Sequence, residues 1–199
     1  MSGAPAGPPG GSLPVTVADV QDAAELLAGV ARRTPLEPSR LLSEQLGGPV
    51  WLKCENLQRT GSFKIRGAYV RIARLPPHER DRGVVAASAG NHAQGVALAA
   101  SLLGTRATVF MPLGAPIPKV AATRGYGAEV RFAGHTVDEA LEAAAELART
   151  TGAVLIHPFD HPDIVAGPGP AGLELFEQCP DVSTVVVPTG GGGLLGGVA

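Results

Sequence analysis

Short apolar, β-branched runs alternate with helical patterns along almost the whole chain, and this alternation is the strongest constraint on its fold. The runs that predict strands are residues 50–54, 84–87, 107–111, 130–132, 154–157 and 185–187. The patterns that predict helices are residues 17–30, 63–72, 93–103, 119–126, 137–149 and 171–179. When strands and helices alternate in this way, neighbouring strands run parallel and helices cover both faces of the sheet. The sequence therefore predicts an α/β fold.

Two of the predicted helices begin with a capping signature. Thr16 stands three residues before Asp19, and Thr136 stands three residues before Glu139. The threonine hydroxyl can accept a hydrogen bond from a backbone N–H that has no partner inside the helix, and the acid can bond back to the threonine N–H. We expect the shorter Asp19 to return this bond less readily than Glu139.

Two proline-rich breaks divide the chain. One is Pro76-Pro77, which precedes a polar stretch, and the other is rich in Pro and Gly and runs from residue 158 to 172. Domain boundaries fall in segments of this kind. We therefore expect a small α/β domain over residues 78–160, inserted into a larger cofactor domain made of residues 15–77 and 161–199.

The two ends of the chain differ from its middle. Residues 1–14 are rich in Gly, Pro and Ala, and we expect a disordered tail there because such a segment buries little apolar surface. The glycine run at residues 190–193 should open a helix, yet the sequence stops a few residues later. We therefore expect the larger domain to be incomplete and the chain to be truncated at its C-terminus.

The composition argues against several function classes. A formal net charge of −2 and a pI near 6.2 do not provide the basic surface that nucleic acids or anionic membranes attract. No run approaches the about 20 apolar residues of a membrane span. Cys54 and Cys179 lack metal-binding spacing, and prolines interrupt the stretch with His157 and His161, so no metal site is expected. These observations predict a cytoplasmic protein with two reduced thiols.

Lys64 is the candidate nucleophile. The chain has three lysines, and a lysine that forms an imine must be partly desolvated, because burial lowers its pKa and frees the amine. Lys53 alternates with apolar residues in a predicted strand and is expected at a solvated rim, whereas Lys119 is expected to start a surface helix. Lys64 lies in the segment 60–68, after a strand and a turn, where α/β proteins bind ligands.

Two further loops favour a site for an anionic ligand. Residues 88–95 connect a predicted strand to a helix, and their small side chains leave backbone N–H groups open to a carboxylate or phosphate. The four glycines at 190–193 follow an apolar run, and glycines let the backbone approach a phosphate closely.

These three segments together resemble the fold-type II pyridoxal-phosphate enzymes, which share the tryptophan synthase β-like fold. The family that the chain resembles is the threonine dehydratase (threonine ammonia-lyase) and serine racemase family. The stretch from Lys53 to Ala68 is most similar to the degradative threonine dehydratases, residues 88–95 resemble the family's asparagine loop, and residues 187–194 resemble its glycine loop. The resemblance extends from about Thr16 to the last residue.

The resemblance implies a role for individual residues. Lys64 would bind pyridoxal 5'-phosphate as a Schiff base and remove the substrate's α-proton, with Phe63 packed beside the cofactor. Asn91 would hydrogen-bond the oxygen on the pyridine ring. The substrate carboxylate would be held by Ser88, Ala89, Gly90 and Asn91. The cofactor phosphate would be held by Gly190, Gly191, Gly192, Gly193 and Leu194.

The resemblance also implies an activity. The chain would dehydrate and deaminate L-threonine, and L-serine, to 2-oxobutanoate or pyruvate and ammonia, as a homo-oligomer of two or four subunits. Serine racemase and hydroxyaspartate dehydratase activities stay open as alternatives within the same family. One departure concerns Gly167-Pro168-Gly169-Pro170, where the family has a Gly-Gln-Gly-Thr segment and two prolines here remove two N–H donors.

Two alternatives come from outside this family. A nicotinamide-dependent oxidoreductase would use a Gly-x-Gly-x-x-Gly loop, which residues 167–172 and 191–196 match formally. The first match does not follow a predicted strand, and no acidic residue follows at the position that binds ribose. The other alternative is a non-catalytic fragment or structural partner that keeps the fold without its chemistry.

Overall fold

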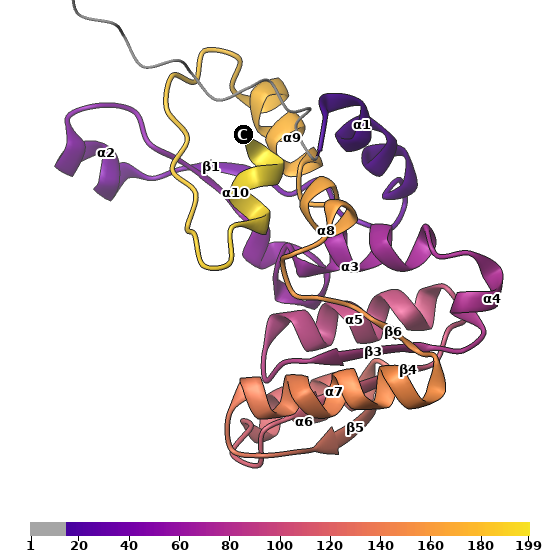
Figure 1. Cartoon of the computed structure of the whole chain (residues 1–199). Coiled ribbons are helices and arrows are strands. Elements are labelled where there is room, and N and C mark those ends of the chain that lie inside the picture. The colour runs from indigo at the N-terminus through magenta and orange to yellow at the C-terminus, as the bar shows by residue number, and fades with distance from the viewer. Residues whose placement is uncertain (1–14) are drawn as a thin grey trace, which may run out of the picture.

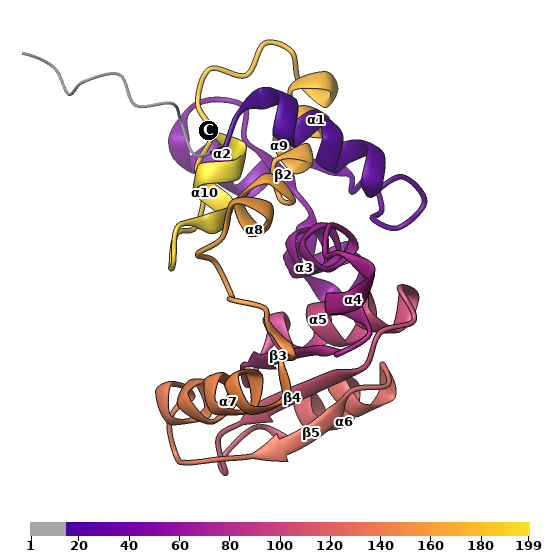
Figure 2. The same cartoon turned by 45° about the vertical axis from the view of Figure 1, so that its right-hand side comes forward.

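The computed structural model describes residues 15–199, so the predicted tail at residues 1–14 lies outside the described part. Figures 1 and 2 show a parallel sheet with its helices at one end of the molecule and a group of helices from both ends of the chain at the other. The sheet has the order β5-β4-β3-β6. Its strands are β3 (Val84–Ala87), β4 (Ala107–Met111), β5 (Glu129–Phe132) and β6 (Val154–Leu155). All neighbouring pairs are parallel, which confirms the predicted α/β fold.

Helices cover both faces of this sheet, as the alternation of strands and helices predicts. The covering helices are α5 (Asn91–Leu102), α6 (Ile117–Gly125) and α7 (Val137–Thr151). Alternate residues of β3 point to opposite faces, because strand side chains have a period of two. Val84 and Ala86 pack in the cluster that holds α5, whereas Val85 and Ala87 pack with α7. Both layers are visible in Figure 1. We call residues 84–155 the sheet unit.

The capping signatures form as hydrogen-bonded boxes in both helices. Thr136 accepts from the Glu139 N–H, and the Glu139 carboxylate accepts from the Thr136 N–H at 3.1 Å. In α1 (Val17–Leu26) the Asp19 carboxylate accepts from the Thr16 N–H at 2.8 Å. The expectation that Asp19 returns this bond less readily was therefore wrong, because the short side chain reaches the threonine N–H without strain on the turn.

The remaining elements come from residues 15–77 and 161–199, which we call the flanking segments. The first segment contains α1, β1 (Leu36–Pro38), α2 (Arg40–Leu46), β2 (Trp51–Lys53), the short 3₁₀ turns η1 (Glu55–Leu57) and η2 (Arg59–Gly61), and α3 (Lys64–Ala73). The connector to the sheet unit contains α4 (Pro77–Arg80), and the second segment contains α8 (Pro162–Ala166), α9 (Pro170–Gln178) and α10 (Gly193–Val198). Strand β2 pairs antiparallel with β1 and not with the main sheet. The domain limits at residues 78 and 160 stay a prediction.

Helix α3 joins the two parts of the molecule. Its buried residues Ile65, Ala68 and Ile72 belong to the same apolar cluster as Val84 and Val96 of the sheet unit. On its other side, Gly67 faces α8 closely, since a Cβ there would lie 3.0 Å from the Ile164 carbonyl oxygen. The start of α3 is therefore fixed from both sides, and Lys64 is its first residue.

The strand predicted at residues 185–187 is absent. Residues 182–189 have no regular secondary structure, and Val186 is 88% exposed. Three consecutive valines favour a pleated, half-buried surface, but a strand also needs a neighbour with free backbone groups. No strand of residues 15–199 lies beside this run. The prediction of a strand at residues 185–187 was therefore wrong.

Buried charges hold the flanking segments together. Arg66, only 1% exposed, donates to the Glu55 carboxylate through Nε and Nη2, both at 2.9 Å, and to Glu174 through Nη1 at 2.8 Å. Lys53 also pairs with Glu174 and donates to the Thr34 carbonyl oxygen at 2.8 Å. The sequence predicted that Lys53 lies at a solvated rim. This prediction was wrong, because α9 covers the end of the side chain.

Candidate active site

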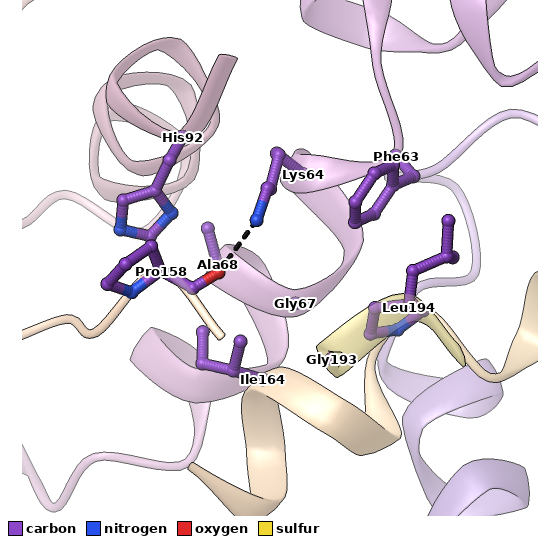
Figure 3. Close-up of a pocket in the computed structure, with 10 residues that line it drawn as sticks. Phe63, Lys64, Gly67, Ala68, His92, Pro158, Ile164, Gly193 and Leu194 are labelled. Carbon is purple, nitrogen blue, oxygen red and sulfur yellow. Dashed lines mark hydrogen bonds between the residues drawn. The ribbon is translucent and has the colours of Figure 1, made fainter. Parts of the chain in front are cut away.

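The Lys64 side chain points into a cavity where three segments of the chain meet (Figure 3). Its ammonium nitrogen donates to the carbonyl oxygen of Pro158 at 2.7 Å. The same nitrogen lies 5.1 Å from the centre of the Phe63 ring, within range of a cation–π contact. The amine is thus held away from open solvent between its neighbour in sequence and the connector that leaves the sheet unit.

Burial lowers the pKa of Lys64 below the usual value for lysine. Desolvation acts in this direction because it disfavours the charged form. Among residues 15–199, no carboxylate lies within ion-pair distance of this amine to oppose the effect. A larger fraction of the amine is therefore neutral near pH 7 than for an exposed lysine, and the neutral amine is the form that attacks an aldehyde.

The cavity around Lys64 is narrow, with a volume of about 10 Å³, which is room for roughly one water molecule. Its walls come from the start of α3, the start of α5, the connector after β6, the turn between α8 and α9, and the glycine loop. The lining residues are Phe63, Lys64, Gly67, Ala68, His92, Pro158, Ile164, Pro168, Gly193 and Leu194. A ligand of the size of pyridoxal phosphate therefore needs the walls to separate, and the Pro158 contact of Lys64 is one that it would replace.

The glycine loop reaches this cavity with two of its five predicted residues, Gly193 and Leu194. Gly192 has φ +87°, a conformation that residues with a Cβ rarely adopt. Gly191 packs under the Phe159 ring so closely that a Cβ there would lie 2.2 Å from the ring, and Gly190 has open space around it. A side chain is therefore disfavoured at Gly191 and Gly192, where the bare backbone can approach a phosphate closely.

The asparagine loop lies at the carboxyl end of β3 and does not line the cavity. Ser88, Ala89 and Gly90 are partly exposed, and the Ser88 hydroxyl accepts from the Gly90 N–H at 3.0 Å. Asn91 is exposed, and its Oδ1 accepts from the Lys119 ammonium at 3.0 Å. The structure therefore gathers Phe63, Lys64, Gly193 and Leu194 around one cavity and leaves the asparagine loop at its edge. The binding roles of all these residues stay predictions.

His92, the next residue along α5, joins the asparagine loop to the cavity. Its ring is buried, and Nε2 lies 2.9 Å from the carbonyl oxygen of Ile156 (Figure 3). Burial lowers the pKa of His92 to about 4. The ring is therefore neutral near pH 7, and because a carbonyl oxygen only accepts, Nε2 carries the proton. His92 therefore donates to the backbone of the residue that follows β6.

Several residues in or near the cavity were not assigned to the site from the sequence. Pro158, Ile164 and Pro168 line the cavity, but nothing in their sequence pattern marks them, since the connector brings them there through the fold. Gly167 could have indicated close packing in this region from the sequence. The end of α8 passes α3 so closely that a Cβ on Gly167 would lie 2.5 Å from the Gly67 Cα. His157 accepts from the Asp160 N–H through Nδ1 at 2.9 Å and is a loop residue, as expected.

Residues 167–172, the first formal dinucleotide-binding match, follow helix α8 and not a strand. A Gly-x-Gly-x-x-Gly loop binds pyrophosphate only where it connects a strand to a helix. The structure therefore removes the context that the nicotinamide alternative needs at this position. Within residues 15–199, none of the helices combines the length and apolar character needed to span a bilayer.

Comparison with known proteins gives a family and several relatives. Residues 27–199 match the family described as pyridoxal-phosphate dependent enzyme. The chain is 56% identical to an L-threonine ammonia-lyase of Thermotoga maritima over 93% of this chain and 46% of that protein. It is 50% identical to an L-threo-3-hydroxyaspartate ammonia-lyase of Pseudomonas over 91% of this chain and 57% of that protein.

Among solved structures, maize serine racemase superposes with a TM-score of 0.90 at 37% identity, over 93% of this chain and 56% of that one. The chain thus spans about half the length of the curated relatives that it matches first. The agreement in fold covers 93% of this chain.

Proposed function

The chain belongs to the family of pyridoxal-phosphate dependent enzymes, and from that premise we propose that it provides the cofactor lysine of a threonine ammonia-lyase. The reaction proposed is dehydration and deamination of L-threonine, and of L-serine, to 2-oxobutanoate or pyruvate and ammonia. The observation that carries the proposal is the Lys64 amine, which is half-buried, has no carboxylate partner among residues 15–199 and shares one cavity with the glycine loop.

The residues present suit the cofactor chemically. Glycines let the backbone approach a ligand closely, and Gly190, Gly191, Gly192, Gly193 and Leu194 are therefore proposed to hold the phosphate through backbone N–H groups. The Phe63 ring lies beside the Lys64 amine and is proposed to pack against the pyridine ring. Asn91 is proposed to donate to the oxygen on that ring.

The chain's own residues are proposed to transfer the proton and to orient the substrate. When bound, the cofactor supplies an electron sink for the substrate's α-carbanion. The Lys64 amine, whose pKa burial lowers, can take the α-proton and return it. The Ser88 hydroxyl and the N–H groups of Ala89 and Gly90 are proposed to orient the substrate carboxylate at the start of α5, where the helix dipole favours negative charge. The Ser88 N–H takes no part, because it donates to the carbonyl oxygen of Phe110.

Threonine is the first choice of substrate because of the similarity to the L-threonine ammonia-lyase of Thermotoga maritima. A second candidate is a 3-hydroxyaspartate, because the hydroxyaspartate ammonia-lyase of Pseudomonas is nearly as similar. Serine racemization stays a third candidate, supported by the superposition on maize serine racemase. All three reactions begin with removal of the α-proton by a lysine, so the site around Lys64 serves each of them.

We also propose a cytoplasmic location and a homo-oligomer of two or four subunits. The two cysteines that the structure describes, Cys54 and Cys179, are free thiols, which is typical of a reducing compartment. An oligomer is the arrangement implied by the resemblance to threonine dehydratases. The product 2-oxobutanoate would place the enzyme in amino-acid metabolism, including isoleucine biosynthesis.

The test is to replace Lys64 and look for the covalent bond to the cofactor. The protein is incubated with pyridoxal 5'-phosphate, reduced with borohydride, and digested for mass spectrometry. We expect a pyridoxyl group on Lys64 in the wild-type protein, none in Lys64→Ala, and an unchanged label in Lys119→Ala at saturating cofactor. A label on another lysine, or no label on wild type, would refute the assignment. Release of 2-oxo acid from threonine, serine and 3-hydroxyaspartate then ranks the substrates.

A further inference from the structure

Lys119 lies at the site although its sequence marked it only as the start of a surface helix. It belongs to the first turn of α6, which follows β4, while Asn91 begins α5, which follows the neighbouring strand β3. The Lys119 ammonium reaches across the edge of the sheet and donates to Asn91 Oδ1 at 3.0 Å. Two loops that are 28 positions apart in sequence are thereby connected at the carboxyl ends of adjacent strands.

This contact determines which way the Asn91 amide faces. The oxygen and nitrogen of an asparagine amide are interchangeable in shape, so only the hydrogen-bond partners decide the orientation. An ammonium group donates and cannot accept, and its partner must therefore be Oδ1. The NH₂ group of Asn91 is then left as the free side of the amide, and it can only donate.

We propose that Lys119 is a positioning residue of the cofactor site, which holds the Asn91 amide so that its NH₂ group is offered to the anionic oxygen on the cofactor ring. This inference rests on the proposed function, because it needs Asn91 to bind the cofactor. Without Lys119 the amide could turn over and present Oδ1 to that oxygen, and two acceptors facing each other repel.

The charges of the three lysines support this placement. The buried Lys53 is neutralised by its ion pair with Glu174. Within residues 15–199, neither Lys64 nor Lys119 forms an ion pair with a carboxylate, and their hydrogen bonds go to the Pro158 carbonyl and the Asn91 amide. Two uncompensated cations thus lie on the segments around the site, where they suit a phosphate-bearing ligand and a carboxylate substrate.

The decisive variant is Lys119→Met, which keeps the length of the side chain and removes the donor and the charge. Cofactor-free protein is titrated with pyridoxal 5'-phosphate, and both the Kd and the visible spectrum as a function of pH are recorded. Because the Lys119–Asn91 bond is exposed, we expect the Kd to rise by roughly three- to ten-fold. We also expect a shifted visible band, while borohydride still attaches the cofactor to Lys64 at saturation.

Three further variants separate positioning from a general effect of charge. Arg124→Met removes a positive charge from the exposed last turn of the same helix and should leave the Kd within two-fold. Lys119→Arg keeps a donor and should recover most of the affinity. In an Asn91→Ala background, Lys119→Met should have no further effect, because the two residues then act as one unit.

A Kd and a spectrum of Lys119→Met that match wild type would overturn the inference, and so would a full additional loss in the Asn91→Ala background. An equal loss in Arg124→Met would also overturn it, since only helix charge would then matter. Failure of the proposed function itself has a different signature, namely no covalent label on Lys64 in the wild-type protein. Urea unfolding of the cofactor-free variants provides the check on folding, and we expect no change for Lys119→Met.

Discussion

The sheet unit and the flanking segments bury their interiors in different ways. In the sheet unit, β3 and β4 are buried along their length and pack between α5 on one face and α7 on the other, with apolar side chains throughout. In the flanking segments the largest fully buried side chain is Arg66, surrounded by Glu55 and Glu174. One region is therefore held by area removed from water, and the other combines a small apolar cluster with a buried set of charges.

This difference matters for the site because Lys64 lies between the two regions. Its helix α3 packs on the sheet unit through Ile65 and enters the charge network through Arg66, two residues after the lysine. Apolar burial tolerates changes of pH and salt, whereas buried ion pairs are sensitive to the loss of one partner. Conditions that disturb the charge network around Arg66 should therefore perturb the position of Lys64 before they perturb the sheet.

The largest expected effect comes from Arg66→Ala. Removing one partner of a buried ion pair leaves the other charges unpaired, and this costs about 3–5 kcal/mol. Trp51, the single tryptophan, lies in β2 of the flanking segments. We expect its fluorescence transition in urea to move further than the circular dichroism transition, which reports the helices of both regions. A matched control is Arg149→Ala, which removes an exposed pair with Glu146 and should cost less than about 1 kcal/mol.

If both variants unfold at the same urea concentration, or if fluorescence and circular dichroism move together by the full amount, the contrast between the regions disappears. In the first case the network contributes no more than a surface pair, and in the second case the molecule unfolds as one cooperative unit. The measurement needs only wild type and the two arginine variants, each followed by both signals.

Several features of the two regions could be predicted from sequence, and the reasons are physical. The strands at 84–87 and 107–111 begin and end at the predicted residues, since a run of apolar residues between turn residues reports local burial. The valines at 185–187 show the same pattern but have no neighbouring strand among the described residues. A pattern thus reports which side chains tend to be buried, and not which partners will cover them.

The site shows the same limit. Lys64 could be singled out because it follows a predicted strand and a turn at the start of a helix. Lys53 was placed at the surface, yet α9 covers it. Lys119 lies in the first turn of a surface helix, as predicted, but its bond to Asn91 was not foreseen. Both contacts join residues far apart in the chain, and single-sequence patterns carry no information about such pairs. The correction therefore falls on Lys53, whose surroundings come from elsewhere in the fold.

A smaller effect is expected from acid. Burial alone would raise the pKa of Glu174, but its hydrogen bonds to Arg66 and Lys53 outweigh burial and lower it below the usual value of 4.5. A carboxyl group whose pKa is lower when folded contributes stability above its unfolded pKa and loses it as the pH falls through the folded one. The stability of wild type should therefore decline below pH 4.5, first in the Trp51 signal.

Two variants distinguish the network from general acid sensitivity. Met111→Ala creates a cavity in the sheet unit and should cost about 2–5 kcal/mol at every pH, with the same acid slope as wild type. Arg66→Ala should show a shallower slope below pH 4.5, because one of the two partners that lower the pKa of Glu174 is already absent. Equal slopes in wild type and Arg66→Ala would assign the acid response to other groups.

The smallest expected effect is the difference in stability loss between the replacements of two prolines that occupy the same helical position. Pro170 begins α9 in the flanking segments, and Pro77 begins α4 beside the sheet unit. At the first helical position a proline loses no useful N–H and restricts the unfolded chain, so replacement by alanine costs about 0.4–1 kcal/mol. Pro170 is also buried, whereas Pro77 is exposed.

Pro170→Ala should therefore lower the free energy of unfolding by more than Pro77→Ala, and the difference is the contribution of the buried ring's packing. Urea unfolding at pH 7 measures both losses. The entropic part is the same for both prolines, and the difference between the variants isolates what the α9 contact adds to the flanking segments. Equal losses would mean that the ring of Pro170 adds nothing beyond the restriction of the unfolded chain. The prolines at 168 and 170 would then be stiffening residues in a turn whose tight packing comes from Gly167 and Gly169.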